Sequence, residues 1–518
     1  MKKFLLTSAV ALLSTVATFS NVSAASSDII PRENMPRTVI TTDGEVDDMN
    51  SVIRSMLYSN ELDIAGIVIT SSTYHYAGNQ ALGIEPFRWT GLNWIYKYID
   101  DYEKVYPNLV RHDPNYPTAD YLRSVTHIGN ITNVGEMDSV TDGSEFLKQL
   151  FLDDDPRVLY VQTWGGTNTT ARALKSIEEE YSGTDQWQSI RDKLARKLFL
   201  YIILDQDDSY GNYIAKNWDN LTVVNDRCDF WHFAYAWKFN NPEVNTTLNA
   251  NWNVFNLLNK GALMSNYALM DDGKWIDGEL PEEQRGVGYI ENHPEYKKFD
   301  FISEGDSPSF LYLVNNGLRS SEDPSYGGWG GRFGAFVGNR AINDALDYNP
   351  FTNQFESVYS LSRWFMDMQN DFAARADWCI ASSYSRANHA PKVIINEGNN
   401  ISAYAGDVVT LHSTAADPDG DKIFYKWWRY FEADTYQDDK RAKPDYVPNE
   451  GFLLNYTRPL LQNEVLDSIP LDGVETDTVS FRVPYDAQSG DTIHIILEVM
   501  DNGAHHLKAY QRVIVTVK

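Results

Sequence analysis

The sequence predicts a chain of two folded parts, an α/β domain followed by an all-β domain. Up to residue 390, short runs of β-branched and apolar residues alternate with segments whose apolar side chains recur at helical spacing. That alternation is typical of an open, mostly parallel sheet with helices on both faces. After Pro391, shorter alternating runs are separated by Gly, Asp, Asn or Pro about every ten residues, which favours an immunoglobulin-like sandwich.

The N-terminus is predicted to be a targeting segment. Two lysines precede an apolar run that ends in Val-Ser-Ala, so residues 1–24 are interpreted as a secretory signal peptide cleaved near Ala24. Residues 25–37 then form a polar lead-in. No other apolar run approaches the roughly 18 residues that a membrane-spanning helix requires. We therefore expect a secreted protein, extracellular or periplasmic, with no membrane partner.

The α/β domain is expected to span residues 38–390. Its first strand is the β-branched run at 38–42, and apolar residues at helical spacing follow up to residue 57. The run at 62–70 is almost continuously apolar, as expected for a strand covered on both faces. Two further strands, near 157–166 and 197–205, enclose a helical pattern at 170–181, which completes the strand–helix–strand alternation.

The all-β domain is expected to span residues 391–518. Six short alternating runs lie between residues 391 and 518, and the stretch at 433–468 fits their spacing poorly, which predicts a long loop. The chain has two cysteines, Cys228 and Cys379, whose spacing specifies no disulfide. Whether they pair is left open at this point.

Charge narrows the classes of partner. The chain has 72 acidic and 44 basic side chains, a formal net charge of −28. Such a surface repels nucleic acid and anionic lipid, so neither is an expected partner. Calcium and neutral carbohydrate are compatible with it, and the 13% of aromatic residues would suit stacking on sugar rings.

The most informative motif is the acidic turn ITTDGEVDD, in which Asp43, Glu45, Asp47 and Asp48 follow the first strand. In an open α/β sheet, ligands bind at the carboxyl ends of the strands. A single acid there is explained by helix capping. Three aspartates within six residues are better explained by calcium, which takes six to eight oxygen ligands. A carboxylate beside such an ion could also serve as a general base.

This turn resembles the signature of the nucleoside hydrolase family, D-x-D-P-G-x-D-D at a strand end. Aligned on Val46-Asp47-Asp48, Asp43 and Asp48 match that family's calcium-binding acids. The resemblance also implies that Asp43 is the general base and that Asp47 hydrogen-bonds the sugar. The expected cofactor is therefore Ca²⁺, and the expected partner is a carbohydrate or a nucleoside-like small molecule.

Two later segments extend the resemblance. VLYVQTWGGTNTTARAL is similar to the family's strand, G-P-L-T-N and helix, which implies a calcium-binding backbone carbonyl at Thr167 and a substrate-binding Asn168. ISEGDSPSFLYLV is similar to the segment of the last calcium acid, which implies Asp306. Nearly all of the chain after the signal peptide resembles secreted nucleoside-hydrolase-like proteins with a C-terminal immunoglobulin-like domain, some of them labelled cellulose-binding proteins.

The sequence also departs from the family. Thr41 stands where the first aspartate is expected, and Gly44-Glu45 replaces Pro-Gly. The family's histidine before the last calcium acid is absent; Glu304 lies there instead, either as a replacement acid or as a hydrogen-bond acceptor behind the site. The ribose-binding segment has no clear counterpart, although DQDDSYGN, which ends at Asn212, follows the appropriate strand.

Three aromatic or imidazole side chains are further candidates for substrate contact. His75 follows the second strand, and Trp164 lies beside Gly165-Gly166. Trp329 lies in the glycine-rich GGWGG, a loop that could close over a ligand. For each of the three, an ordinary structural role is the alternative.

A second acidic motif, DPDGD at Asp417–Asp421, lies in the all-β domain. It resembles a calcium loop but lacks the full twelve-residue pattern of ligands. The alternative is a turn that only closes a hairpin. The sequence leaves both interpretations open.

The sequence therefore predicts a secreted, calcium-dependent hydrolase of a glycosidic bond, N- or O-glycosyl and furanoside-like. Asp43 would activate the attacking water, and Glu304 is the candidate second catalytic group. The alternative is a protein that binds cellulose or another plant or microbial polysaccharide without cleaving it.

Overall fold

The computed structural model describes residues 31–334, 336–436, 455–461 and 466–518. The predicted signal peptide and residues 25–30 of the lead-in therefore lie outside the described residues, as does much of the predicted loop at 433–468. Within the described residues, no helix is both long and apolar enough to cross a membrane.

The α/β domain is built on a seven-stranded sheet in which all neighbouring strands are parallel. The strand order is β3-β2-β1-β4-β5-β6-β7. Every residue of the interior strands β1 and β2 is buried, which explains their continuous apolar and β-branched sequences. The strands are β1 (Arg37–Thr42), β2 (Asp63–Ile69), β3 (Thr126–Ile128), β4 (Leu159–Thr163), β5 (Leu198–Ile203), β6 (Thr222–Asp226) and β7 (Arg340–Ile342).

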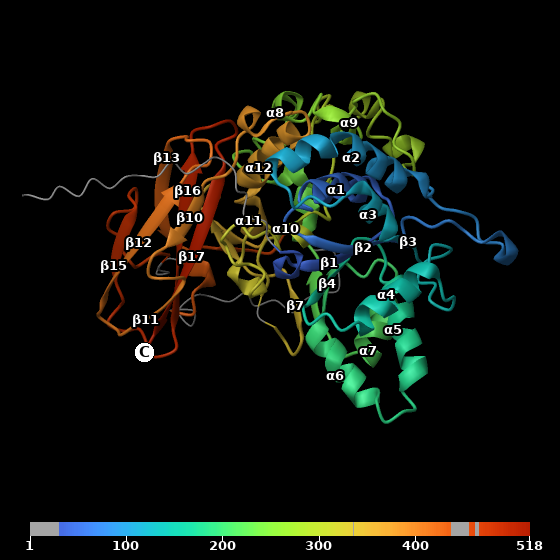
Figure 1. The fold of residues 1–518 in the computed structure, drawn as a ribbon, viewed down its shortest axis with the longest axis horizontal. Helices are drawn as coiled ribbons and strands as arrows, with labels where there is room; N and C mark the ends of the chain where they lie inside the picture. Colours follow the sequence, from blue (N-terminus) through green and yellow to red (C-terminus); the bar gives the residue numbers. More distant parts are fainter. Residues whose placement is uncertain (1–30, 335, 437–454, 462–465) are drawn as a thin grey trace, which may run out of the picture.

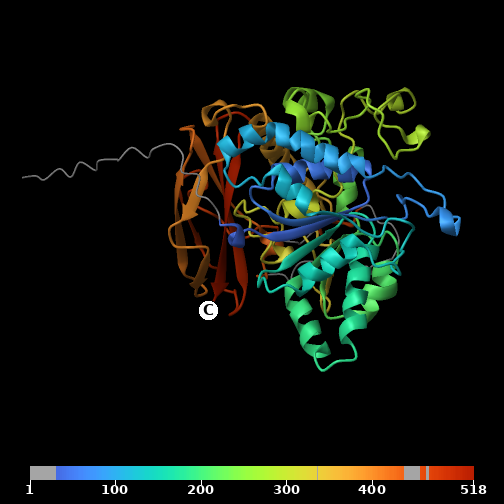
Figure 2. The same cartoon turned by 45° about the vertical axis from the view of Figure 1, so that its right-hand side comes forward.

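Helices cover both faces of this sheet (Figure 1). Successive residues of β1 point to opposite faces, so Ile40 belongs to one hydrophobic core and Val39 to the other. The first core contains α1 (Val46–Leu57), α2 (Asn93–His112) and α12 (Phe365–Trp378), and the second contains α4 (Asp142–Leu152), α5 (Asn168–Tyr181) and α6 (Trp187–Lys197). Figure 2 shows the two layers from a second direction. The predicted α/β class is thus confirmed.

Shorter elements complete this domain. Most of the chain between β6 and β7, residues 227–339, is irregular and carries three of the short α-helices. The short helices are α3 (Ala119–Ser124), α7 (Ala215–Asn217), α8 (Ala250–Asn256), α9 (Gly261–Met264), α10 (Pro308–Leu311) and α11 (Tyr359–Ser362).

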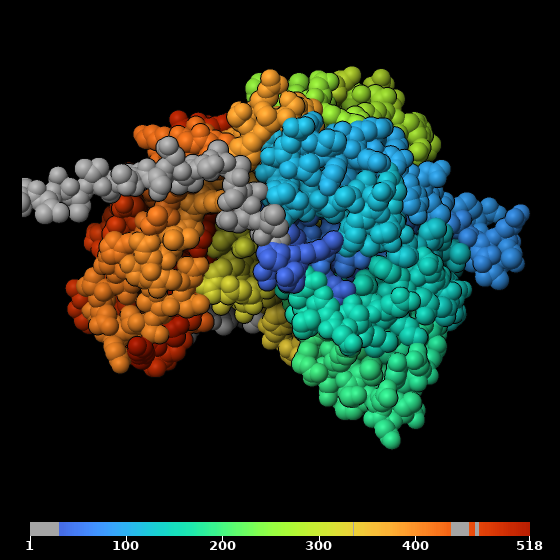
Figure 3. Space-filling view, in the orientation of Figure 1, coloured from blue at the N-terminus to red at the C-terminus, as the bar shows by residue number. Residues whose placement is uncertain are grey.

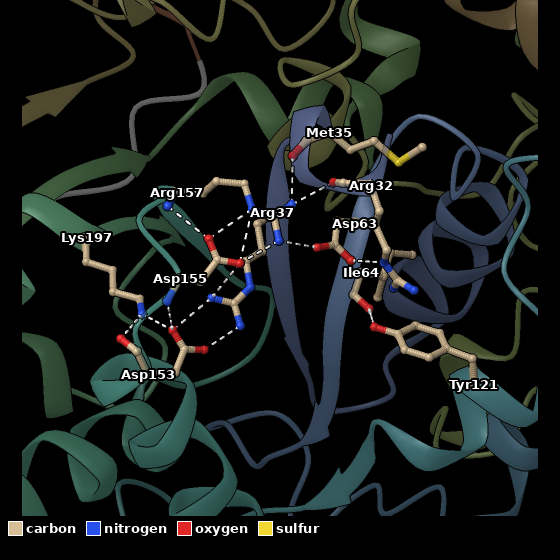
Figure 4. Close-up of polar contacts among 10 residues, drawn as sticks. All are labelled: Arg32, Met35, Arg37, Asp63, Ile64, Tyr121, Asp153, Asp155, Arg157 and Lys197. Carbon is tan, nitrogen blue, oxygen red and sulfur yellow. Dashed lines mark hydrogen bonds and ion pairs between the residues drawn. The ribbon is translucent and has the colours of Figure 1, made fainter. Parts of the chain in front are cut away.

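The amino edge of the sheet is closed by a network of ion pairs (Figure 4). Arg37 at the start of β1 pairs with Asp153, with 2.6 Å between Nη2 and Oδ2. Arg157 pairs with Asp155 at 2.6 Å and with Asp63 at the start of β2 at 2.8 Å. Lys197 adds a second cation to Asp153. Each aspartate at this edge is therefore matched by a basic side chain.

The C-terminal part is all-β, as predicted. A three-stranded sheet, β10-β12-β15, packs against a four-stranded sheet, β11-β17-β16-β13, and both contribute to one hydrophobic core. Buried and exposed residues alternate along β12, as expected for a strand with one face in the core. The strands are β10 (Lys392–Ile395), β11 (Asn400–Ala403), β12 (Val408–Ala416), β13 (Ile423–Arg429), β15 (Thr478–Arg482), β16 (Thr492–Asp501) and β17 (Lys508–Val517).

The structure corrects part of the predicted loop at 433–468 and shows whether the two cysteines pair. The stretch predicted as a long loop at 433–468 contains β14 (Thr457–Pro459), which pairs with β9 (Gln354–Glu356), itself paired with β8 (Asp347–Asn349). The loop prediction is corrected there, because three residues of the insert extend a sheet of the first domain. Cys228 and Cys379 are both buried, unpaired thiols.

The two parts of the molecule are joined by backbone hydrogen bonds as well as by side chains. The amides of Tyr510 and Arg512 on β17 donate to the carbonyls of Asn316 and Gly317, at 2.9 and 3.0 Å. Gly317 has a φ of +93°, and a Cβ there would lie 1.9 Å from the Tyr510 carbonyl oxygen. In Figure 3 the C-terminal strands, orange to red, lie directly against the yellow surface of the first domain.

Candidate functional site

The site lies where the order of the strands reverses. β1 and β4 are neighbours, but the chain leaves them toward opposite sides of the sheet, since β2 and β3 lie beyond β1 and β5–β7 lie beyond β4. The loops that follow β1 and β4 therefore diverge and leave a crevice at the carboxyl edge, the usual ligand site of such sheets. The Trp164 amide after β4 donates to the Thr41 carbonyl at 2.9 Å and fixes one loop against the other.

Four aspartates converge on this crevice. Asp43 directly follows β1, and Asp47 and Asp48 occupy the first turn of α1. Asp306 comes from the segment before α10, yet one of its carboxylate oxygens lies within 4.8 Å of those of Asp47 and Asp48. All four residues are at most 7% exposed. The fold thus brings Asp306 to the acidic turn, as the sequence predicted.

Local hydrogen bonds fix the directions of these carboxylates. Asp48 Oδ1 accepts from the Thr42 hydroxyl and, at 3.2 Å, from the Asp43 amide. Asp47 accepts from the Tyr235 hydroxyl at 3.2 Å. Gly44 adopts a φ of +80°, which reverses the chain between β1 and α1.

Two carboxylate oxygens of the cluster accept no hydrogen bond from the described residues. Asp43 Oδ2 and Asp306 Oδ2 are buried and have no hydrogen-bond partner among the described residues. A Cβ on Gly165 would lie 2.9 Å from the Asp43 carboxyl carbon, so only glycine lets the loop after β4 approach Asp43 so closely. Buried, unpartnered carboxylate oxygens are costly unless a cation or a proton compensates them.

The four aspartates repel one another and have no compensating positive charge among the described residues. Burial, followed by repulsion from Asp43, raises the pKa of Asp47 to about 6. Burial and the neighbouring aspartates also raise the pKa values of Asp48 and Asp306 well above the usual range. In the described parts of the chain, no Lys or Arg forms an ion pair with any of the four. Several hard carboxylate oxygens without a basic partner fit a cation such as Ca²⁺.

A pocket of about 260 Å³ opens beside the aspartates. Aromatic rings form much of its wall, which suits the apolar face of a sugar ring, and the polar groups sit at its base and rim. Its lining residues are Glu45, Asp47, Asp48, Tyr74, Arg88, Trp164, Ile203, Leu204, Gln206, Phe230, Trp231, Tyr235, Glu283, Arg285 and Asp306.

Three other predicted residues lie in or beside this pocket. Trp164 lines it, and its indole N–H donates to the Ser309 hydroxyl at 2.8 Å. His75 does not line it but is fully buried behind it, and burial lowers its pKa to about 4. Thr167 begins α5, and its carbonyl accepts from the Ala171 amide at 2.8 Å, which leaves one lone pair for the predicted metal contact.

Three predictions of substrate contact are corrected by the structure. The Asn168 side chain is fully buried and bonds to Thr70, Ser71 and the Asn130 carbonyl, so it holds loops together behind the pocket. Asn212 is exposed on the short helix at Tyr210–Ile214 and does not line the pocket. Trp329 is 2% exposed and packs edge-on against Tyr510 of the all-β part.

Glu304 is also placed away from the pocket. Its carboxylate is fully buried and pairs with Arg54, with 2.8 Å between Nη2 and Oε1. It also accepts from the Ser307 hydroxyl at 2.7 Å and from the Tyr267 hydroxyl. Of the two interpretations left open by the sequence, this geometry favours the hydrogen-bond acceptor and corrects the prediction of a replacement acid.

Sequence reasoning missed the rim of the pocket. Arg88 and Arg285 both contact Glu279, at 2.9 and 3.2 Å, and Arg88 lies 3.6 Å from Glu45. Tyr235 donates to Asp47, as described above. These side chains come from irregular segments without periodicity, so the sequence held no signal that could have found them.

The fold and this crevice define a nucleoside-hydrolase-like α/β protein. Residues 37–333 match the family model of the "cellulose-binding Sde182, nucleoside hydrolase-like domain", and residues 408–517 match that of the "cellulose-binding protein Sde0182, C-terminal domain". Because the first match covers more than half of the chain, the protein belongs to this cellulose-binding Sde182 family. The resemblance stated from the sequence is confirmed.

One solved structure supports the fold. A nucleoside hydrolase-related hypothetical protein from Saccharophagus degradans, described as associated with carbohydrate metabolism, is 27% identical, with a TM-score of 0.67, and the match covers 93% of this chain and all of that one. A plant nucleoside hydrolase, PpNRh1, is 10% identical over 60% of this chain and 87% of its own, with a TM-score of 0.28. No curated protein matches.

Proposed function

We propose that the crevice binds Ca²⁺ together with a sugar and that the protein hydrolyses a glycosidic bond, N- or O-glycosyl and furanoside-like. The observation that carries the proposal is the cluster of four buried aspartates, which lacks a basic partner among the described residues and adjoins an aromatic pocket. The family match to a nucleoside-hydrolase-like domain supports it. The predicted signal peptide adds the proposal that the protein works outside the cytoplasm.

The residues divide by role. Asp43, Asp48, Asp306 and the Thr167 carbonyl would hold the ion, and Asp47, steadied by Tyr235, would accept a hydrogen bond from a sugar hydroxyl. A bound calcium ion supplies orientation of vicinal hydroxyls and a lower pKa for a nearby water. Trp164 and the neighbouring aromatic rings would cover the sugar and keep bulk water out of the pocket.

Asp43 would take the proton of the attacking water. Its free Oδ2 is buried and unpartnered among the described residues. The backbone at Gly165 lies so close to this carboxylate that any side chain at position 165 would clash with it. As the water's oxygen bonds to the anomeric carbon, its proton passes to this carboxylate and the glycosidic bond breaks. General-base assistance of this kind contributes about 10²–10⁴ to a rate.

We assign no residue to protonate the leaving group as it departs. Glu304 is held by Arg54, and none of the lining residues is a histidine. Without protonation, the rate depends steeply on how stable the departing anion is. We therefore expect aryl furanosides with good leaving groups to react faster than nucleosides or alkyl glycosides.

The test is hydrolysis of p-nitrophenyl furanosides, nucleosides and oligosaccharides, with calcium and with a chelator. Wild-type protein is expected to act on at least the aryl furanosides, and only with calcium. Asp43→Asn, assayed at calcium and ligand concentrations shown by titration to saturate the variant, should lower kcat by about 10²-fold or more. The control Asp138→Asn changes a fully exposed carboxylate of the same domain and should leave turnover unchanged.

A second candidate function is binding of a polysaccharide without cleavage. The name of the matched family favours it, as does the lack of a histidine among the described residues that line the pocket. If wild-type protein releases neither reducing sugar nor base from the panel, yet binds cello-oligosaccharides in a calcium-dependent manner, carbohydrate binding is the function. In that case Asp306→Asn should abolish the binding.

A further inference from the structure

A second cluster of oxygens lies where the segment linking the two domains meets the all-β part. Asn388 belongs to that linker, and its amide nitrogen donates to Asp501 at 2.9 Å and to the Ala504 carbonyl at 2.7 Å. Its own backbone carbonyl accepts from the Trp378 indole at 3.0 Å. The Asn388 side chain is therefore fixed between α12 and the turn that joins β16 to β17.

The remaining oxygen of that amide has no donor. Asn388 is 7% exposed, and its Oδ1 atom is buried without a hydrogen-bond partner among the described residues. It faces a second acceptor across Gly503, since a Cβ there would lie 2.5 Å from Asn388 Oδ1 and 2.4 Å from Asp421 Oδ2. Two acceptors directed at the same place need a shared donor or a cation.

The DPDGD turn, to which Asp421 belongs, holds another oxygen without a donor among the described residues. Asp417 Oδ1 accepts from the amides of Asp419 and Asp421, at 2.9 and 3.0 Å. Its other oxygen, Oδ2, is buried and unpartnered in the described part of the chain. Asp419 is already engaged, because it accepts from the His389 amide at 2.8 Å.

The charge around these oxygens is negative. Asp501 is fully buried, and its pKa rises to about 6 because of burial, with Asp417 adding repulsion. No Lys or Arg within the described ranges pairs with Asp417, Asp421 or Asp501. The donor set is all oxygen, a carboxamide and carboxylates, which is the chemistry that calcium selects over softer metals.

We propose that Asn388, Asp417 and Asp421 hold a second calcium ion, separate from the one proposed for the crevice. Asp501 positions Asn388 for this role through the hydrogen bond to its amide nitrogen. Because one ligand comes from the linker and two come from the β12–β13 turn, the ion would bind the linker to the all-β part. Under this proposal the DPDGD motif is a cation site and not only a hairpin turn.

Calcium stoichiometry tests the proposal on the full chain. After removal of metal with a chelator, isothermal titration should show two calcium ions per wild-type chain. Asp417→Asn and Asp306→Asn should each bind one, and the double variant none. The control Asp491→Asn, which alters a turn carboxylate elsewhere in the all-β part, should still bind two. An Asp417→Asn chain that binds as many ions as wild type overturns the proposal, whether or not Asp306→Asn loses an ion.

Proteolysis gives a readout that does not depend on activity. Arg386 is exposed in the linker, two residues before Asn388. Because local opening limits cleavage of folded chains, calcium should slow trypsin cleavage after Arg386 about tenfold, as quantified by mass spectrometry. The protection should vanish in Asp417→Asn and persist in Asp306→Asn; equal protection in both contradicts the proposal. If Asp417→Asn does not fold, Asp421→Asn is expected to show the same loss and takes its place.

Discussion

The two edges of the parallel sheet treat their carboxylates differently. At the amino edge, Asp63, Asp153 and Asp155 all contact arginine or lysine (Figure 4). At the carboxyl edge, the four aspartates of the crevice are buried, yet they pair with no basic side chain among the described residues. The aspartates at the amino edge are therefore neutralised by basic side chains of the chain itself, whereas, within the described parts of the chain, the four that we assign to a ligand are not.

The same contrast between a paired and an unpaired acid recurs within a stretch of three residues. Glu304 is fully buried and paired with Arg54, whereas Asp306, two positions later, faces the aspartate cluster. Burial alone therefore does not distinguish a structural acid from a site acid. Between these two acids, the difference is the basic partner that Glu304 has and that Asp306 lacks among the described residues.

The largest expected effect comes from breaking the matched pair. Arg54→Met should lower the free energy of unfolding by about 3–5 kcal/mol, because Glu304 would remain as a buried charge without a partner. Urea unfolding measures the change. Arg123→Met, which removes an arginine of exposed ion pairs, should cost about 0–1 kcal/mol. A loss for Arg54→Met no greater than for this control would contradict the structural role of the pair.

An intermediate effect is expected from the unmatched cluster. Asp306→Asn should leave the protein in chelator at least as stable as wild type, because it removes one of several like charges that repel each other. It should also abolish the gain from calcium at the crevice, about 2.7 kcal/mol when calcium is at 100 times its dissociation constant. Thermal unfolding with and without calcium, in an Asp417→Asn background, measures this site alone.

The matched control for that prediction lies at the other edge of the sheet. Asp155→Asn removes an acid paired with Arg157 and should lower stability by up to about 1 kcal/mol, equally with and without calcium. If Asp306→Asn behaves as this control does, the two edges do not differ in the way described.

The smallest expected effect concerns His494, a histidine that contacts the buried cation Arg512. Arg512 is fully buried and donates to the carbonyls of Leu318 and Gly327 and, at 2.9 Å, to His494 Nδ1. Burial, with Arg512 adding repulsion, lowers the pKa of His494 to about 2. An unfolded chain binds this proton near pH 6.5, so stability is retained above that value and declines as the pH falls toward 2.

From pH 7 to pH 5 this histidine should cost about 2 kcal/mol of unfolding free energy. His494→Gln keeps an acceptor for Arg512 but does not titrate, so its loss over that range should be smaller than that of wild type by this amount. Urea unfolding at both pH values measures the difference. Parallel losses in the two proteins would show that His494 does not charge on acidification.

The sequence predicted the parts of the site that regular structure positions. Asp43, Asp47 and Asp48 sit at a strand end and in a first helical turn, and both elements follow from periodicity and composition. Asp306 required the family resemblance, because nothing in a single sequence places a distant loop against that turn. The two-part architecture followed from the change of pattern near residue 390.

The failures have a common cause. Asn212 and Trp329 were assigned from the motifs around them, but burial and orientation depend on tertiary contacts, and these turn the first toward solvent and the second toward β17. Arg88 and Arg285 were missed because the segments that carry them have no period. Glu304 was predicted near the right place, yet its role depended on Arg54, a partner 250 positions earlier in the chain.

The bonds from β17 to the Asn316 and Gly317 carbonyls bear on how the protein can be dissected. These carbonyls lie about ten positions beyond Asp306, and Trp364 of the first domain packs edge-on against Tyr510. A fragment ending at the linker would lose those donors and expose that indole to water. The all-β part therefore stabilises the segment that follows Asp306. An isolated α/β domain would lack these contacts, so its crevice need not keep the geometry that it has in the full chain.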